Sequence, residues 1–96
     1  DGINKMVDTA LPENIISNIK SEVLSVEGVL DIVLLKTRQF GNKSYIDVEI
    51  AVDGELSLEK SHEIAALVHK NIEQKFPTIK HCMVHVNPYK ENHKAT

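Results

Sequence analysis

The chain has 96 residues, which is enough for one domain. Hydrophobic residues make up 42% of it and charged residues 26%, so the composition excludes a disordered chain. Fourteen acidic and eleven basic residues give a formal net charge of −3, which argues against a nucleic-acid-binding protein. The single cysteine cannot form an internal disulfide, so the sequence predicts a domain stabilised by packing and compatible with a reducing compartment.

The beginning of the chain indicates a fragment or a processed product, because it opens with Asp1-Gly2 and not with methionine. No apolar run approaches the about 18 residues that a membrane helix needs, and no charged-then-apolar leader is present. Residues 1–11 mix polar and isolated apolar side chains, which predicts a linker that ends before Pro12.

A first helix is predicted from Pro12, a residue suited to the first helical position, to just before Gly28. Glu13 lies near the positive end of the helix dipole, where a carboxylate is favourable. One face of this helix carries the recurring apolar residues Ile15, Ile16, Ile19 and Val23.

Two β-rich runs, 29–38 and 44–52, flank Gly41-Asn42 and predict a β-hairpin. The second run alternates, so the core-facing set is predicted to be Ile46, Val48, Ile50 and Val52, with Tyr45, Asp47, Glu49 and Ala51 on the opposite face. The first run leaves two alternatives for its outward set, either Leu30, Ile32 and Leu34 or Asp31, Val33 and Leu35. Both contain bulky apolar side chains, which predicts a self-association surface beside Glu49 and His85.

A second helix is predicted after the turn at Asp53-Gly54, with Ser57 as its N-cap and an end before Pro77. Its apolar stripe consists of Leu58, Ala65, Val68, Ile72 and Phe76. The last strand, 81–87, is predicted to send Cys82, Val84 and Val86 toward the core and His81, Met83, His85 and Asn87 to the other face. The order helix, strand, strand, helix, strand predicts an α+β two-layer sandwich in which two helices cover one face of a three-stranded sheet.

Five histidines are the most unusual feature of the composition: His62, His69, His81, His85 and His93. His62 and His69 share a helix face but lie roughly 10 Å apart, and His81 and His85 share a strand face at roughly 13 Å. Neither pair can chelate one ion. A metal site would instead combine His62, His85 and Glu49 from three different elements.

The other chemical candidates have ordinary structural explanations. His69, His81 and His93 fit surface histidines, and alternation along a wet strand accounts for both Asp47 and Glu49. Cys82 falls in the core-facing set and is expected to be a buried thiol. Because the chain has no phosphate-binding glycine loop, serine elbow or Cys-x-x-Cys motif, we expect no enzymatic activity.

Short sequence matches, in order along the chain, resemble the cytoplasmic C-terminal domain of cation diffusion facilitator transporters. These matches are Met6-Val7-Asp8-Thr9-Ala10-Leu11-Pro12, Val26-Glu27-Gly28-Val29, Thr37-Arg38, Gly41-Asn42, the strand with Asp47, Leu56-Ser57-Leu58-Glu59 followed by His62 and Ala65, Phe76-Pro77, and His85-x-x-Pro88. The resemblance implies a metallochaperone-like, ferredoxin-like α-β-β-α-β domain at 12–88, a linker from a missing transmembrane domain at 1–11, and a polar tail at 89–96. It also implies a homodimer on the cytoplasmic side of the cell membrane, in a transporter that exports zinc, manganese or iron in exchange for protons.

The resemblance implies a metal site at the dimer contact. By position, the family's helix and last-strand histidines fall on His62 and His85, its middle-strand ligand falls on Glu49, and an acid falls on the neutral Asn87. A first-strand histidine of some members falls on Val33, which cannot bind metal, so Asp31 on the same predicted face is the substitute candidate. The expected ligand set for a divalent ion, zinc or manganese, is therefore His62, His85, Glu49, Asp31 and Asn87.

The leading hypothesis is thus a dimerising regulatory domain that senses a divalent cation. One alternative is a structural dimerisation module without regulatory metal binding. Another is a free-standing metallochaperone-like domain, although the sequence lacks the binding loop that such a domain usually has.

Overall fold

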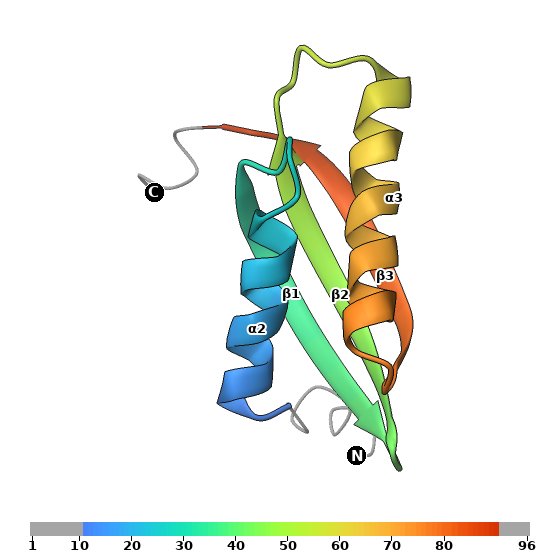
Figure 1. Cartoon of the computed structure of the whole chain (residues 1–96). Helices are drawn as coiled ribbons and strands as arrows, with labels where there is room; N and C mark the ends of the chain where they lie inside the picture. Colours follow the sequence, from blue (N-terminus) through green and yellow to red (C-terminus); the bar gives the residue numbers. More distant parts are fainter. Residues whose placement is uncertain (1–10, 91–96) are drawn as a thin grey trace, which may run out of the picture.

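The computed structural model describes residues 11–90, which form two helices and three strands in the predicted order (Figure 1). The elements are helix α2 (Glu13–Leu24), strand β1 (Asp31–Phe40), strand β2 (Lys43–Val52), helix α3 (Leu58–Lys75) and strand β3 (Ile79–Pro88). Most of the predicted linker, the end of the predicted tail and His93 lie outside the described residues. No helix within the described range is long and apolar enough to cross a bilayer.

The three strands form one sheet in the order β1-β2-β3. β1 and β2 are antiparallel neighbours, as expected for a hairpin, whereas β3 runs parallel to β2. Helix α3 lies against β3 and α2 against β1, and both helices are on the same side of the sheet (Figure 1). The fold is therefore the predicted two-layer α-β-β-α-β sandwich, with one sheet face left open.

The helix ends have identifiable causes. The Ser57 hydroxyl accepts a hydrogen bond of 3.0 Å from the backbone N–H of Lys60, which confirms the predicted N-cap of α3. Pro12 was predicted to be the first residue of the helix. In the structure it is the N-cap of α2, and the helix begins one residue later, at Glu13. After α2, Gly28 has a φ of +102°, a conformation that side-chain-bearing residues rarely adopt, and this allows the chain to turn toward β1.

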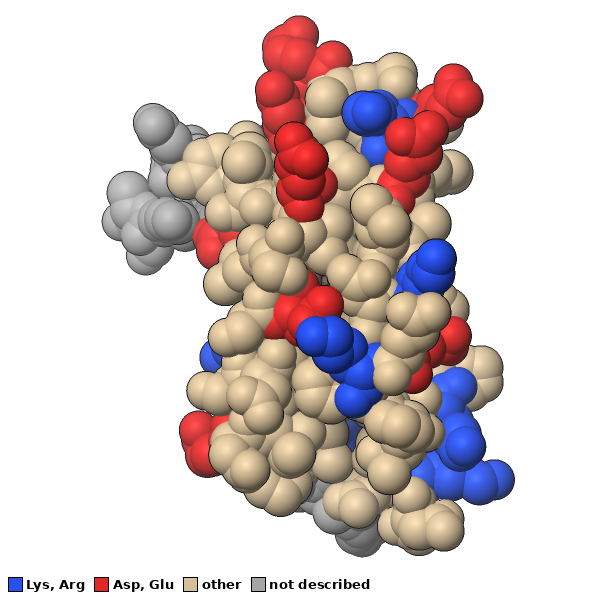
Figure 2. Space-filling view, in the orientation of Figure 1, with Lys and Arg blue, Asp and Glu red and all other residues tan. Residues whose placement is uncertain are grey.

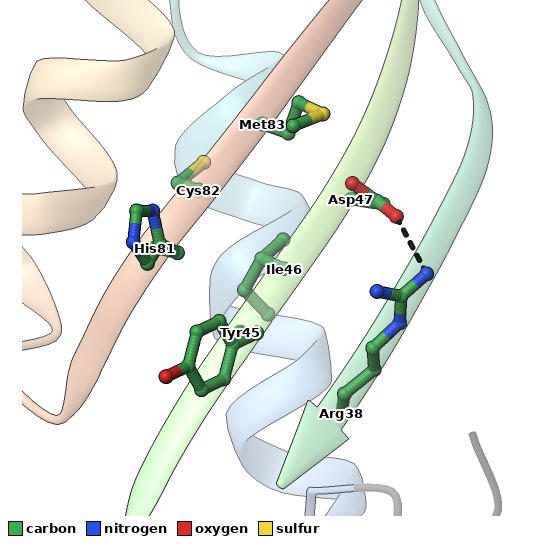
Figure 3. A pocket seen from close by; sticks show the side chains of 7 residues that line it. All are labelled: Arg38, Tyr45, Ile46, Asp47, His81, Cys82 and Met83. Atoms are coloured by element: carbon green, nitrogen blue, oxygen red, sulfur yellow. Dashed lines mark hydrogen bonds and ion pairs between the residues drawn. The ribbon is translucent and has the colours of Figure 1, made fainter. Parts of the chain in front are cut away.

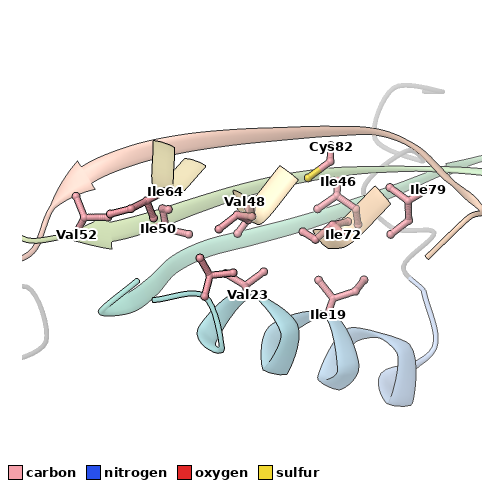
Figure 4. Packing of buried hydrophobic residues seen from close by; sticks show 12 residues of the cluster. Ile19, Val23, Ile46, Val48, Ile50, Val52, Ile64, Ile72, Ile79 and Cys82 are labelled. Carbon is pink, nitrogen blue, oxygen red and sulfur yellow. The ribbon is translucent and has the colours of Figure 1, made fainter. Parts of the chain in front are cut away.

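The core lies between the sheet and the two helices (Figure 4). The predicted inward set of β2 is buried, and α2 and α3 contribute their apolar stripes to the same cluster. The buried core residues are Ile19, Val23, Val26, Ile46, Val48, Ile50, Val52, Ile64, Val68, Ile72, Ile79 and Cys82. The predicted α3 stripe is correct for Val68 and Ile72, whereas Leu58 is 75% exposed.

Strand β1 contains a β-bulge that neither predicted outward set anticipated. Ile32 pairs with Ile50, but Leu34 and not Val33 pairs with Glu49, so one extra residue is inserted at Val33. As a result Asp31 and Leu34 lie on the open face, and Ile32 faces the core. Both alternatives were wrong because each assumed unbroken alternation along the strand.

Candidate functional site

The open face of the sheet brings four of the five predicted ligands into two adjacent rows. In one row, Glu49 on β2 pairs directly with His85 on β3. In the next row, Ala51 lies between Asp31 on β1 and Asn87 on β3. Since paired residues point to the same side of a sheet, all four candidate side chains belong to the open face.

A hydrogen bond fixes the relative position of two of these residues. The amide Nδ2 of Asn87 donates to Oε1 of Glu49 at 3.2 Å. Because a carboxylate offers about four acceptor positions, this bond leaves most of the accepting capacity of Glu49 available. Glu49 is half-buried and His85 is exposed, so the carboxylate is oriented next to an accessible imidazole.

The fifth candidate, His62, lies on α3 near its start, on the helix that packs against β3. A hollow along the β3 side of the molecule is lined by His62 and His85 together, with Asn87 and Ala65 also contributing. Both histidines are exposed. The helix and strand histidines thus border the same hollow at the β3 edge of the sheet, and their cooperation as ligands stays a prediction.

Within residues 11–90, no group of three or more His, Cys, Asp or Glu side chains is close enough to hold a metal ion. Asp31 is on β1, two strands away from Asn87, which corresponds to about 10 Å at the usual strand spacing. A single chain therefore supplies parts of the predicted ligand set but does not assemble it. The ligand set stays a prediction, and any complete site needs a group from elsewhere.

A second hollow lies further along the open face, toward the β1–β2 turn (Figure 3). There Nη2 of Arg38 forms an ion pair with Oδ2 of Asp47 at 3.1 Å, and the ring of Tyr45 stacks on His81 at 5.4 Å between centroids. Sequence alternation predicted Tyr45, Asp47 and His81 as outward-facing strand residues but gave no sign that they form a cluster with Arg38.

Cys82 borders this second hollow but belongs to the core-facing side of β3. It is 6% exposed, and burial raises the pKa of its thiol to about 12, with smaller contributions from the negative charges of Glu73 and Asp47. The thiol is therefore neutral at physiological pH, which does not favour a role for Cys82 as a nucleophile. The predicted buried cysteine is confirmed.

Large apolar side chains are exposed on and beside the open face. Leu34, the β1 partner of Glu49, is 39% exposed, and Met83 on β3 is 58% exposed. Phe40 and Val33 add further apolar surface on β1. This arrangement is typical of a surface that a partner covers, and Leu34 confirms the apolar surface predicted beside Glu49.

Comparison with known protein families gives one match that covers nearly the whole described range. Residues 11–89 match the model of the dimerising domain described as "Cation efflux protein, cytoplasmic domain". The chain is 33% identical over 86 residues to metal tolerance protein C1 of Arabidopsis thaliana, covering 90% of this chain and 18% of that protein. It is 24% identical over 89 residues to the manganese efflux system protein MneP of Bacillus subtilis, covering 93% of this chain and 30% of that protein.

Among solved structures, a MamM CTD variant in its manganese form superposes on the chain with a TM-score of 0.77 at 27% sequence identity. The match covers 80% of this chain and 98% of that one. The solved domain and this chain therefore share their architecture over almost the full length of the former, whereas the chain spans less than a third of either relative named above.

Proposed function

Since the chain belongs to the cation efflux protein family, as its dimerising cytoplasmic domain, we propose that it senses a divalent cation and regulates a transporter through its dimer contact. The observation that carries this proposal is the hollow shared by His62 and His85, next to the row in which His85 pairs with Glu49. Because one chain supplies an incomplete set, a second copy brought against this surface completes the coordination.

The regulatory effect follows from linkage between binding and assembly. An ion that binds only the closed pair of domains stabilises that pair by RT ln(1 + [ion]/Kd), so the stabilisation grows with the logarithm of the ion concentration. A hundredfold excess over Kd would contribute about 2.7 kcal/mol. Cytosolic metal concentration would thereby set the arrangement of the two domains.

The ligand chemistry favours zinc or manganese. Imidazole suits zinc, whereas the oxygens of Glu49, Asp31 and Asn87 suit a harder ion such as manganese. MneP is a manganese efflux protein by name, and the superposed MamM domain is a manganese form. A mixed nitrogen and oxygen set is compatible with both ions, so each has to be titrated.

In the whole protein, we place residues 12–88 as a domain on the cytoplasmic side of the cell membrane. Residues 1–11 would link it to a transmembrane domain of the same polypeptide, and 89–96 would be a polar tail. Transport of the cation, in exchange for protons, would be carried out by that transmembrane domain, because the described residues hold no membrane-spanning helix.

One observation favours a second function, a purely structural dimerisation module. At the bulge of β1, Val33 and Leu34 are 42% and 39% exposed, so the surface next to Glu49 is apolar. Burial of such side chains drives association without any ion. This alternative predicts a dimer whose stability does not depend on metal.

Titration calorimetry and analytical ultracentrifugation of this chain with zinc and with manganese test the proposal. The test variant is His62→Ala with His85→Ala. The matched control is His69→Ala with His81→Ala, which also removes one histidine from α3 and one from β3. His69 contacts Glu73 and His81 stacks on Tyr45, so the control pair has structural partners instead of the shared hollow.

Metal sensing requires that the ion tighten the dimer, that the test variant lose both heat and tightening, and that the control retain both. A dimer that is equally stable with and without metal in all three proteins would leave only the structural module.

A further inference from the structure

Charged side chains are separated along the long axis of the domain. Figure 2 shows most acidic side chains toward the end where α3 begins and most basic side chains toward the opposite end, where Glu13 at the start of α2 and Glu73 near the end of α3 are acidic exceptions. That opposite end, here called the hairpin end, contains the β1–β2 turn, the last turn of α3 and the start of β3. At the acidic end lie Glu27, Asp31, Asp53, Glu55, Glu59 and Glu63, with Lys60 and Lys90 as the basic residues.

Three exposed lysines surround the turn from α3 to β3 at the hairpin end: Lys43, Lys75 and Lys80. Lys43 and Lys80 lie on neighbouring strands next to a paired position, because Ser44 of β2 pairs with Ile79 of β3. The backbone N–H of Ser44 also donates a hydrogen bond of 3.1 Å to the carbonyl of Thr78. Lys75 contacts Glu22 at 3.4 Å, while Lys43 and Lys80 form no ion pair within the described part of the chain. Their charges are therefore available to an external anion.

An exposed aromatic ring accompanies these lysines. Phe40 is the β1 residue that pairs with Lys43, and it is 46% exposed. Its ring packs edge-to-face on Tyr45 at 5.1 Å between centroids, which fixes its position on the open face. An aromatic ring beside basic side chains is the combination that favours the boundary between lipid headgroups and acyl chains.

The described chain also enters the domain at the hairpin end. Leu11 and Pro12 line a hollow together with Asn42 of the β1–β2 turn and with Lys75. In the proposed function, on which this step rests, the residues before Leu11 lead from the membrane domain. The hairpin end is then the end of the domain nearest the bilayer.

We propose that the hairpin end docks on the anionic headgroups of a lipid bilayer through Lys43, Lys80 and Phe40. The acidic end is repelled by the same surface, so the charge separation would orient the domain as well as attract it. The formal net charge of −3 makes this a demanding prediction. A protein with evenly distributed charge of this sign would avoid an anionic membrane.

Sedimentation with lipid vesicles, with a metal chelator present, tests the docking. The wild-type chain is expected to bind vesicles of phosphatidylcholine mixed with phosphatidylglycerol, to ignore phosphatidylcholine alone, and to dissociate at high salt. The test variant is Lys43→Glu with Lys80→Glu. The matched control is Lys20→Glu with Lys60→Glu, which makes the same change in net charge at exposed helix positions away from the hairpin end.

The test variant should lose at least about fivefold in partition coefficient for each lysine, because each change removes an attracted charge and adds a repelled one, whereas the control should lose little. Equal losses in the two variants, or no binding by the wild-type chain at low salt, would overturn the proposal. Zinc titration of the same proteins keeps this result separate from the proposed function, because the lysine variants retain His62 and His85.

A Phe40→Trp variant tests the docking by tryptophan fluorescence, without any change in charge. Docking of the hairpin end predicts a blue shift of tryptophan emission on adding anionic vesicles and quenching by lipids brominated near the headgroup. Unchanged emission from vesicle-bound protein would show that another surface makes the contact.

Discussion

Asn87 on β3 donates a hydrogen bond of 3.2 Å to the carboxylate of Glu49 on β2, diagonally across the open face of the sheet. The bond joins a neutral amide to a half-buried acid beside His85. It therefore fixes the position of a carboxylate without placing a second negative charge next to it.

Substitution Asn87→Asp should have opposite effects on stability and on metal affinity. Without metal, two adjacent carboxylates repel and the hydrogen bond is lost, so we expect about 1 kcal/mol of destabilisation. With metal, the added charge should tighten zinc binding by about tenfold, the low end of effects seen on changing a metal's surroundings. Thermal unfolding in chelator and in zinc measures both.

Asn42→Asp, which adds the same charge at the exposed hairpin turn, is the control and should change neither quantity. If both variants bind zinc equally, position 87 does not contribute to the site.

Gly28→Ala should destabilise the domain by about 3 kcal/mol. A Cβ atom at this position would lie 2.5 Å from Cδ1 of Ile64, and the φ of +102° is unfavourable for alanine. Gly41→Ala is the comparison, since its φ of +61° carries strain of about 1 kcal/mol but no atom lies within 4 Å of the added Cβ. Urea unfolding measures the loss in free energy of unfolding for each variant, and equal losses would contradict the predicted clash at Gly28.

Truncation of a central core residue should be costly. Ile50 is fully buried in the middle of β2, so Ile50→Ala should reduce the free energy of unfolding by about 3 to 4 kcal/mol. Leu58→Ala at the 75% exposed start of α3 should change it by less than about 0.5 kcal/mol. Chemical denaturation of the pair checks whether the core lies where the structure places it.

The buried thiol of Cys82 predicts a pH dependence of stability at alkaline pH. Its pKa is about 12 in the folded protein, above the ordinary value of 9.0, because burial disfavours the thiolate. The folded state therefore keeps its proton between pH 9 and 12 while the unfolded state loses it, and stability falls as pH rises through this window.

The slope attributable to Cys82 should be of order 1.4 kcal/mol per pH unit. It is measured as the difference between wild type and Cys82→Ala, because the subtraction removes the pH dependence that the two proteins share. Parallel stability profiles would mean that the thiol is solvated. The native thiol should also react slowly with maleimide at neutral pH until the protein is unfolded.

The sequence was sufficient to predict the order of elements because residues typical of helix and strand ends separate its apolar segments. Ser57 and Gly28 mark element ends that the structure confirms, and strict alternation along β2 separated its core residues from Glu49. Alternation along β2 and β3 also predicted Glu49 and His85 on the same face of the sheet, and the register pairs the two residues directly.

The bulge in β1 could not be predicted in the same way. Nearly every residue from Val29 to Leu35 is apolar, so shifting the pattern by one position leaves an equally apolar set on either face. The sequence also could not show that one chain brings fewer than three metal-ligating side chains together within the described residues. Spacing along a sequence predicts the face on which a residue lies but not its distance from a residue on another element.

The bulge also makes the open face tolerant of one extra residue in β1. With unbroken alternation backward from Leu34, Asp31 would point into the core and Ile32 would point outward; the single extra residue at Val33 reverses both. Deletion of Val33 would remove the bulge but leave Ile32 opposite Ile50 and Asp31 opposite Ala51, so Ile32 would still face the core and Asp31 the open face. The bulge therefore accommodates one extra residue in β1 without changing which of the flanking side chains are offered to a partner.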